Sequence, residues 1–314
     1  MQLEKIEDYF NSLPPVPYQV YRVSVGSGRI YYRMIEDSPR FYISLTTMTS
    51  ATLPTSEFLI KWIADMGYDE SRKYMNERAD YGSVMHYAIG VFCKEKAFDI
   101  DKTEEFITFC KETGICKQVK PEWTDELKRD IAAFAQFAHD YNLVPLAIEM
   151  VLVSEDGYGT LIDMVCNMTI TEKGLDHDNP YKSGKRKGEP REIKVKRKIK
   201  ALINFKSGKH GFYDTHEIQL EFEKRLFTEN YPDIKIDAIY NWSPKDWSGK
   251  PSYNLKDQTG SLNSEKADAL LALAKIELMK KMVFNTTIEG PIKFGSTPKI
   301  KSRSLTEYIK ERHQ

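Results

Sequence analysis

The chain has few cysteines, and they are far apart. Its 314 residues include only Cys93, Cys110, Cys116 and Cys166, and no two of them have C-x-x-C spacing. No histidine lies at zinc-finger distance from any of them. We therefore expect four reduced, buried thiols, and neither a zinc site nor an iron–sulfur cluster.

Long apolar runs and a charge excess are also missing. No run approaches the length that crosses a bilayer, and residues 1–5 do not begin a hydrophobic signal region. The 46 basic residues balance the 46 acidic ones, so net charge does not point to nucleic acid. We expect a cytoplasmic protein with no membrane partner, and any nucleic-acid contact must come from a local concentration of charge.

Hydrophobic residues make up 41% of the chain, enough for a packed core. Apolar periodicity predicts helices over residues 3–11, 55–66, 70–92, 101–112, 124–141, 214–227, 264–282 and from 304. Alternation predicts strands within 18–45 and over 147–153, 158–170, 193–200, 201–206, 234–240 and 253–255. Residues 171–190 are polar and rich in glycine, and we expect a long loop there.

These elements divide the chain into three parts. Residues 1–140 hold strands and a mainly helical subdomain, and residues 141–285 hold alternating strands and helices. Residues 286–314 are rich in glycine and proline before a short helix. We expect this last part to be an extended arm suited to docking on a protein partner.

Two acidic residues lie on the two arms of a predicted hairpin. The Asp156-Gly157 turn joins a strand containing Glu149 to a strand containing Asp163. The second strand is otherwise apolar, and a buried aspartate needs a partner. That partner is either a divalent cation or a salt bridge at the strand end.

Several short motifs follow one another in a recognisable order. A hydroxyl-rich strand end at residues 44–47 precedes a G-x-x-x-H helix ending in His86, and G-x-x-x-D ends in Asp163. The segment Asn204-Phe205-Lys206 and a helix with Gln219 complete the series. Over roughly residues 40–240 the chain resembles the PD-(D/E)xK nucleases, in the RecB-like, phage-type exonuclease branch that includes the mitochondrial genome maintenance exonuclease.

The resemblance implies an α/β fold. Its restriction-endonuclease-like core would be a central mixed β-sheet flanked by helices, with the N-terminal helical subdomain arching over the site. It also implies a Mg²⁺- or Mn²⁺-dependent DNA exonuclease, holding one or two ions and acting on DNA ends or single strands. The expected setting is DNA replication, recombination or processing in a bacterium or phage, with the protein in the host cytoplasm or in a virion.

The resemblance also assigns roles to individual residues. The metal ligands would be His86, Asp163, Asn204 and the carbonyl of Phe205. Lys206 would orient or polarise the attacking water, Gln219 would orient Lys206 or a phosphate, and Glu149 would complete the metal shell or hold a water ligand. Some relatives hold an iron–sulfur cluster with one early and three late cysteines, but no cysteine follows Cys166 here.

Asn204 departs from the family, which has an acid at this position. An amide oxygen brings no charge, so it attracts a dication less strongly. The missing acid could come from Glu149, Asp214, Glu217 or Glu221, or the site could work slowly with Mn²⁺. Alternatively, catalysis is lost, and the chain binds nucleic acid or serves as a structural component of an assembly such as a virion.

Basic residues are concentrated between residues 182 and 209, where twelve of them accompany only two glutamates. Alternation over residues 193–200 would place a row of charges on one face of a strand. Such a row suits phosphates, or it guards a solvated edge strand against aggregation. The candidate nucleic-acid contacts are Lys185, Arg186, Lys187, Lys194, Lys196, Lys198 and Lys209.

Overall fold

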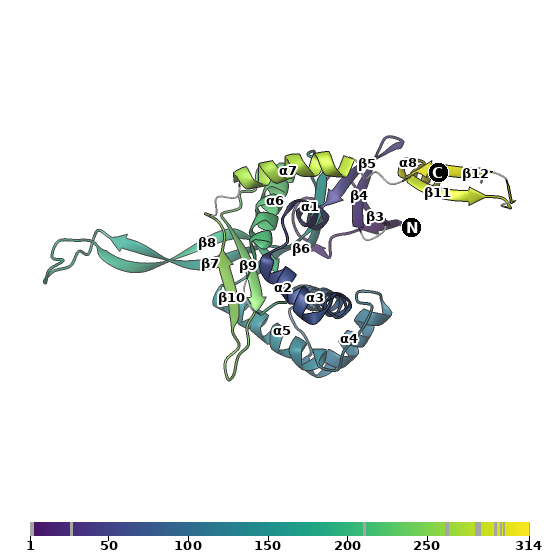
Figure 1. Cartoon of the computed structure of the whole chain (residues 1–314). Helices are drawn as coiled ribbons and strands as arrows, with labels where there is room; N and C mark the ends of the chain where they lie inside the picture. The colour runs from purple at the N-terminus through teal and green to yellow at the C-terminus, as the bar shows by residue number, and fades with distance from the viewer. Residues whose placement is uncertain are drawn as a thin grey trace.

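A computed structural model describes residues 3–25, 28–209, 212–260, 264–279, 284–291, 294–295, 297 and 299–313 (Figure 1). Its centre is a ten-stranded sheet ordered β1-β3-β4-β5-β7-β8-β9-β10, in which β6 pairs with β7 and β2 with β6. The strands are Leu3–Ile6 (β1), Phe10–Asn11 (β2), Val20–Val25 (β3), Gly28–Ile35 (β4), Ser38–Ser44 (β5), Val144–Val153 (β6), Tyr158–Asp176 (β7), Arg191–Phe205 (β8), Ala238–Pro244 (β9) and Tyr253–Asp257 (β10).

The sheet is mixed, as predicted. β5 pairs in parallel with β7 and β8 with β9, while the other pairs are antiparallel. Strands from both sides of residue 140 belong to this one sheet. The division into parts at that residue stays a prediction.

Helices cover both faces of the sheet (Figure 1). Because side chains alternate along a strand, Ile203 of β8 packs on the side of α3 and α5, and Leu202 on the side of α1, α6 and α7. The helices are Leu45–Thr52 (α1), Glu57–Met66 (α2), Tyr68–Glu95 (α3), the short 3₁₀ turn Ile100–Lys102 (η1), Thr103–Glu112 (α4), Trp123–Asp140 (α5), Asp214–Asn230 (α6), Ser264–Met279 (α7) and Leu305–His313 (α8). The predicted α/β class with a mixed sheet flanked by helices is confirmed. Within the described residues, no helix combines the length and apolar character that a bilayer crossing requires.

Three local predictions were wrong. Residues 3–11 form β1 and β2, because they pair with distant strands, as in Ile6 opposite Val20. The hydroxyl-rich segment after Ser44 begins helix α1, where Thr49 Oγ1 donates to the carbonyl of Leu45. The loop predicted over residues 171–190 is shorter. β7 continues to Asp176, which pairs with Arg191, the first residue of β8.

The C-terminal part is a hairpin followed by a helix. Strands Phe284–Glu289 (β11) and Lys299–Ser304 (β12) pair with each other, and α8 follows as predicted. Ile309 of α8 is buried against Val23 and Tyr32. The helix therefore packs on the chain's own sheet, and a protein contact through residues 286–314 stays a prediction.

Candidate metal centre

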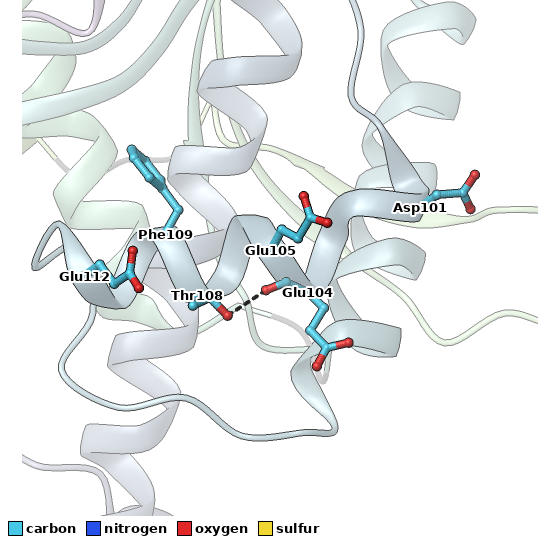
Figure 2. A pocket seen from close by; sticks show the side chains of 6 residues that line it. All are labelled: Asp101, Glu104, Glu105, Thr108, Phe109 and Glu112. Atoms are coloured by element: carbon cyan, nitrogen blue, oxygen red, sulfur yellow. Dashed lines mark hydrogen bonds between the residues drawn. The ribbon is translucent and has the colours of Figure 1, made fainter.

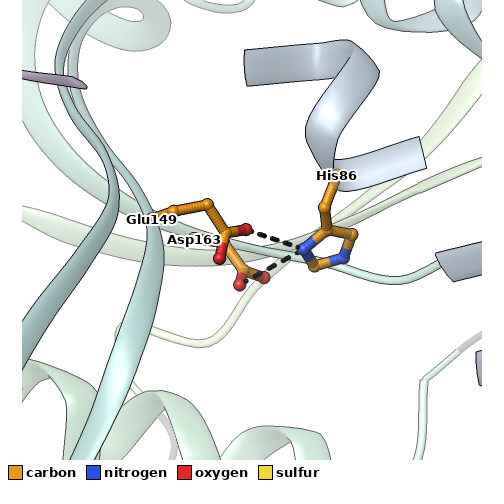
Figure 3. A group of neighbouring side chains, drawn as sticks. All are labelled: His86, Glu149 and Asp163. Carbon is orange, nitrogen blue, oxygen red and sulfur yellow. Dashed lines mark hydrogen bonds and ion pairs between the residues drawn. The ribbon is translucent and has the colours of Figure 1, made fainter. Parts of the chain in front are cut away.

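Three predicted site residues from distant segments come together (Figure 3). His86 reaches from α3 towards Glu149 on β6 and Asp163 on β7. Its Nδ1 lies 3.1 Å from Glu149 Oε1 and 3.5 Å from Asp163 Oδ1. One potential ligand atom from each side chain lies within 4.8 Å of the others.

Strand pairing and an unusual backbone conformation position the two acids. Ile148 pairs with Met164 and Met150 with Ile162, so Glu149 lies opposite Asp163 in the hairpin. Glu149 has a φ of +49°, in the left-handed region that non-glycine residues rarely adopt. Such a conformation costs roughly 1–3 kcal/mol and is concentrated at functional sites.

The charges in the group influence one another strongly. Burial opposes protonation of His86, but Asp163 and Glu149 outweigh burial and raise the pKa of the imidazole to about 9. Burial and the Glu149 carboxylate raise the pKa of Asp163, although the main-chain N–H of Phe205 donates to Asp163 Oδ2 at 2.6 Å. Without a bound ion, the group therefore favours a protonated imidazole beside its carboxylates.

A chain of hydrogen bonds begins at Lys206, just beyond β8. Lys206 Nζ donates to Gln219 Oε1 at 3.1 Å, and Gln219 Nε2 donates to Glu223 Oε1 at 2.7 Å. Burial lowers the pKa of Lys206, although Asp163 and Glu223 oppose this shift. The predicted contact between Gln219 and Lys206 is therefore present.

Sequence reasoning did not include Glu223 among the site residues. Its side chain is fully buried on α6, and its Oε2 has no hydrogen-bond partner among the described residues. Burial, and then the Asp163 carboxylate, raises the pKa of Glu223 to about 8. Its position four residues after Gln219 places both on one helix face, which is the signal that could have revealed it.

Asn204 is fully buried, and neither its Nδ2 nor its Oδ1 has a hydrogen-bond partner within the described part of the chain. By strand alternation it projects to the same face as Leu202, towards α6. It is paired in register with Asn241 of β9, whose buried amide also lacks partners among the described residues. The roles predicted for the Asn204 amide and the Phe205 carbonyl stay predictions.

The other acids considered as replacements for the family acid are engaged elsewhere or not described. Glu217 forms an ion pair with Lys256, and Glu221 forms one with Arg225. The side chain of Asp214 lies outside the described residues. Among the described acids considered from the sequence, this leaves Glu149, which lies with His86 and Asp163 in what we name the candidate metal group.

The basic residues divide into two locations. Lys185, Arg186 and Lys187 lie in the loop between β7 and β8, and Lys194, Lys196 and Lys198 lie on the exposed part of β8. Lys209 lies elsewhere, with its Nζ 3.0 Å from Asp246 Oδ1 and 3.8 Å from Glu126 Oε1. Its charge is therefore partly neutralised within the protein.

A separate acidic hollow lies along η1 and α4 (Figure 2). Four of its lining residues are carboxylic acids, and the others are Thr108 and the half-exposed Phe109. Phosphates would be repelled here. The acids are Asp101, Glu104, Glu105 and Glu112.

The donor set at His86 suits a hard divalent cation. Carboxylate oxygens are preferred by Mg²⁺ and Mn²⁺, and ligands at about 2.1 Å from one ion lie about 3 Å apart. The distances of 3.1 and 3.5 Å from His86 Nδ1 to the two carboxylates are close to that spacing. A comparison with protein-family models gave no match, and a search of curated protein sequences found no similar sequence.

Proposed function

We propose that this chain is a metal-dependent DNA nuclease. The observation that carries the proposal is the convergence of His86, Glu149 and Asp163, with the charge of Lys206 acting on His86 and Asp163. An imidazole, two acids and a lysine form a set of groups suited to phosphodiester hydrolysis. The activity proposed is that of an exonuclease acting on DNA ends or single strands in bacterial or phage DNA metabolism.

The order of the strands supports a restriction-endonuclease-like core in the RecB-like branch. The hairpin β6–β7 continues into β8 and the parallel β9, with α3 and α5 on one face and α6 on the other. The acids lie on β6 and β7, and the lysine follows β8. This matches the order in which that family presents its site.

His86, Glu149 and Asp163 would hold the ion. When bound, Mg²⁺ or Mn²⁺ supplies positive charge that stabilises the phosphate and lowers the pKa of a water molecule. The Lys206 ammonium, which donates to Gln219, would orient the attacking water towards the phosphate. In hydrolysis the water would lose a proton to solvent as its oxygen bonds to phosphorus, the bond to the leaving oxygen would break, and the leaving oxygen would take up a proton from solvent.

Glu223 answers the difficulty that Asn204 raises. Its carboxyl group lies on α6, the helix towards which Asn204 projects, and it bonds the glutamine that holds Lys206. Asp163 and Glu223 both act on the charge of Lys206, and Glu149 lies beside Asp163 at His86. Because its pKa is about 8, Glu223 is mostly protonated at neutral pH without an ion, so it supplies the charge that Asn204 lacks only when a bound dication displaces its proton.

The test is to incubate labelled duplex and single-stranded DNA with Mg²⁺ or Mn²⁺. We expect metal-dependent products. Loss of a residue that only supports a metal ligand typically lowers activity by about 10- to 100-fold, so Asp163→Asn, which alters a proposed ligand itself, should lower the rate at least about 100-fold. Asp130→Asn is the matched control, because Asp130 is another buried aspartate, bonded to Tyr81. Its rate should stay close to that of the wild type.

Two outcomes would contradict the proposal. Absence of products with salt-sensitive DNA binding would favour a nucleic-acid-binding protein on a nuclease fold, as the neutral Asn204 allows. Absence of both cleavage and binding would favour a structural component of an assembly.

A further inference from the structure

The β7–β8 hairpin extends beyond the body of the protein as a two-stranded ribbon (Figure 1). We name residues 169–198 of this hairpin the arm; it is distinct from the C-terminal part of the chain, residues 286–314. All residues of β8 from 191 to 198 are exposed, and Figure 1 shows no helix against this part of the hairpin. The arm therefore forms no core of its own, and its side chains are available to a partner.

The register of the hairpin sorts the charges of the arm by face. Lys194 lies opposite Lys173, Lys196 opposite Thr171, and Lys198 opposite Thr169. These six residues share one side of the ribbon, which we name the lysine face; Glu192 is on the same side and forms an ion pair with Arg186 at 3.3 Å. Among the described residues, its four lysines form no salt bridge.

The opposite face is neutralised. Arg197 forms an ion pair with Glu172 at 2.8 Å, and Arg191 lies opposite Asp176. Val195 adds an apolar side chain to this side, beside a glycine. Lysines that only protect an edge strand need not gather on one face, so this sorting favours a binding surface.

The spacing of the lysine face suits a phosphate backbone. Alternate residues of a strand are about 6.7 Å apart, close to twice the axial rise of about 3.4 Å between phosphates of one DNA strand. A two-stranded ribbon also fits the major groove, which is about 12 Å wide. The threonines opposite Lys196 and Lys198 can donate further hydrogen bonds to phosphate.

Single-stranded nucleic acid is a poorer fit, because its binding sites use aromatic side chains on which bases stack. From residue 164 to 204 the one Phe, Tyr or Trp is Tyr181. Its ring is already covered by Arg186 at 4.8 Å and Arg191 at 5.7 Å. We infer that the arm binds duplex DNA through its backbone, with the lysine face against the phosphates and without reading the base sequence.

This inference rests on the proposed function for its role, since it names duplex DNA as the substrate class. β8 runs from Lys198 directly to Phe205, beside the candidate metal group. Seven residues of strand span roughly 24 Å, or about seven base pairs of duplex. The arm would therefore hold the duplex about that far from the point of cleavage.

The test measures binding of the full chain to labelled DNA in EDTA, where cleavage cannot occur. A duplex of about 20 base pairs and a single strand of the same length are titrated over a range of salt concentrations. Two double variants are compared, each removing two positive charges from the arm. Lys194→Gln/Lys196→Gln alters the lysine face, and Arg191→Gln/Arg197→Gln alters the opposite face.

We expect the lysine variant to reduce the slope of log affinity against log salt by up to about 1.8, since each phosphate contact contributes about 0.9. The arginine variant should change it by less than half as much. Equal effects of both variants, or tighter binding of the single strand, would overturn the inference. If only the lysine variant weakens binding and no DNA is cleaved in Mn²⁺, the inference stands and the nuclease proposal is refuted. If DNA is cleaved in Mn²⁺ at the same rate by both variants and the wild type, the nuclease proposal stands and the inference is refuted.

Discussion

Replacing Asn204 with aspartate tests whether this position belongs to the metal centre. The variant places another carboxyl group between β8 and α6, where Asn204 is fully buried and its amide lacks hydrogen-bond partners among the described residues. Without an ion, the new carboxyl group is buried without a positive charge to stabilise its ionised form. With an ion bound at the proposed site, it would stand where the resembled nucleases have an acid.

Glu223 sets the scale of the effect, because burial and Asp163 raise its pKa from 4.5 to about 8. A carboxyl group with a raised pKa in the folded state destabilises the fold increasingly as pH rises from its unfolded towards its folded pKa. If the aspartate shares this shift, the free energy of unfolding at pH 7 falls by about 4 kcal/mol. For a chain of this size that lowers the melting temperature by about 6 °C.

Thermal unfolding in EDTA and in Mn²⁺ measures both effects. Mn²⁺ at about 100 times its dissociation constant stabilises a folded site by about 2.7 kcal/mol, and a tighter site gains more. We expect Asn204→Asp to lose stability in EDTA and to recover more than the wild type in Mn²⁺. Asn241→Asp is the matched control, since Asn241 is equally buried in the next strand and should lose stability without that extra recovery.

Equal recovery of the two variants would refute the reasoning, because Mn²⁺ would then not distinguish position 204 from its neighbour. The same conclusion follows if Asn204→Asp is as stable as the wild type in EDTA and responds no more strongly to Mn²⁺. Position 204 would then not face the site.

Three further predictions concern titration and charge. The imidazole of His86 must lose its proton to bind a metal, so Mn²⁺ affinity measured by calorimetry should rise by up to about tenfold per pH unit up to about pH 9; a flat profile would contradict this role. Glu223→Gln removes a carboxyl group whose raised pKa destabilises the metal-free fold above about pH 4.5, so urea unfolding in EDTA should show a gain near pH 8 that disappears near 4.5. Lys209→Gln should leave DNA affinity within about twofold, because Asp246 and Glu126 already pair with this lysine, and a large loss in a binding titration would place it in the interface.

Much of the candidate metal group could be predicted from the sequence, because its parts leave local signals. The Asp156-Gly157 turn sets the hairpin that brings Glu149 and Asp163 opposite each other. The position of Glu223 was visible, but its burial was not, since glutamate on an amphipathic helix usually faces solvent. Only the packing of α6 against the sheet shows that this acid points inward.

The errors in the fold have the same origin. Strand β1 is stabilised by its pairing with β3, and no feature of residues 3–6 in the sequence indicates that distant partner. The arm was underestimated because a ribbon exposed on both faces has no apolar alternation for residues 171–176 to display. Its strand structure comes from pairing with β8 alone.

The unfavourable features of this chain gather around one place. Of eight buried side-chain atoms without hydrogen-bond partners among the described residues, six belong to Asn204, Glu223, Asn241 and Trp242. Glu149 adds its left-handed backbone, and burial raises the pKa of both Asp163 and Glu223. Buried acids that resist ionisation, beside an imidazole held protonated, are typical of sites that await a cation. A dication among them would displace the proton of the imidazole and favour the ionised form of Asp163 and Glu223. One ligand therefore accounts for the charge perturbations, whereas the N–H groups of Asn204, Asn241 and Trp242, unpaired within the described part of the chain, need acceptors instead.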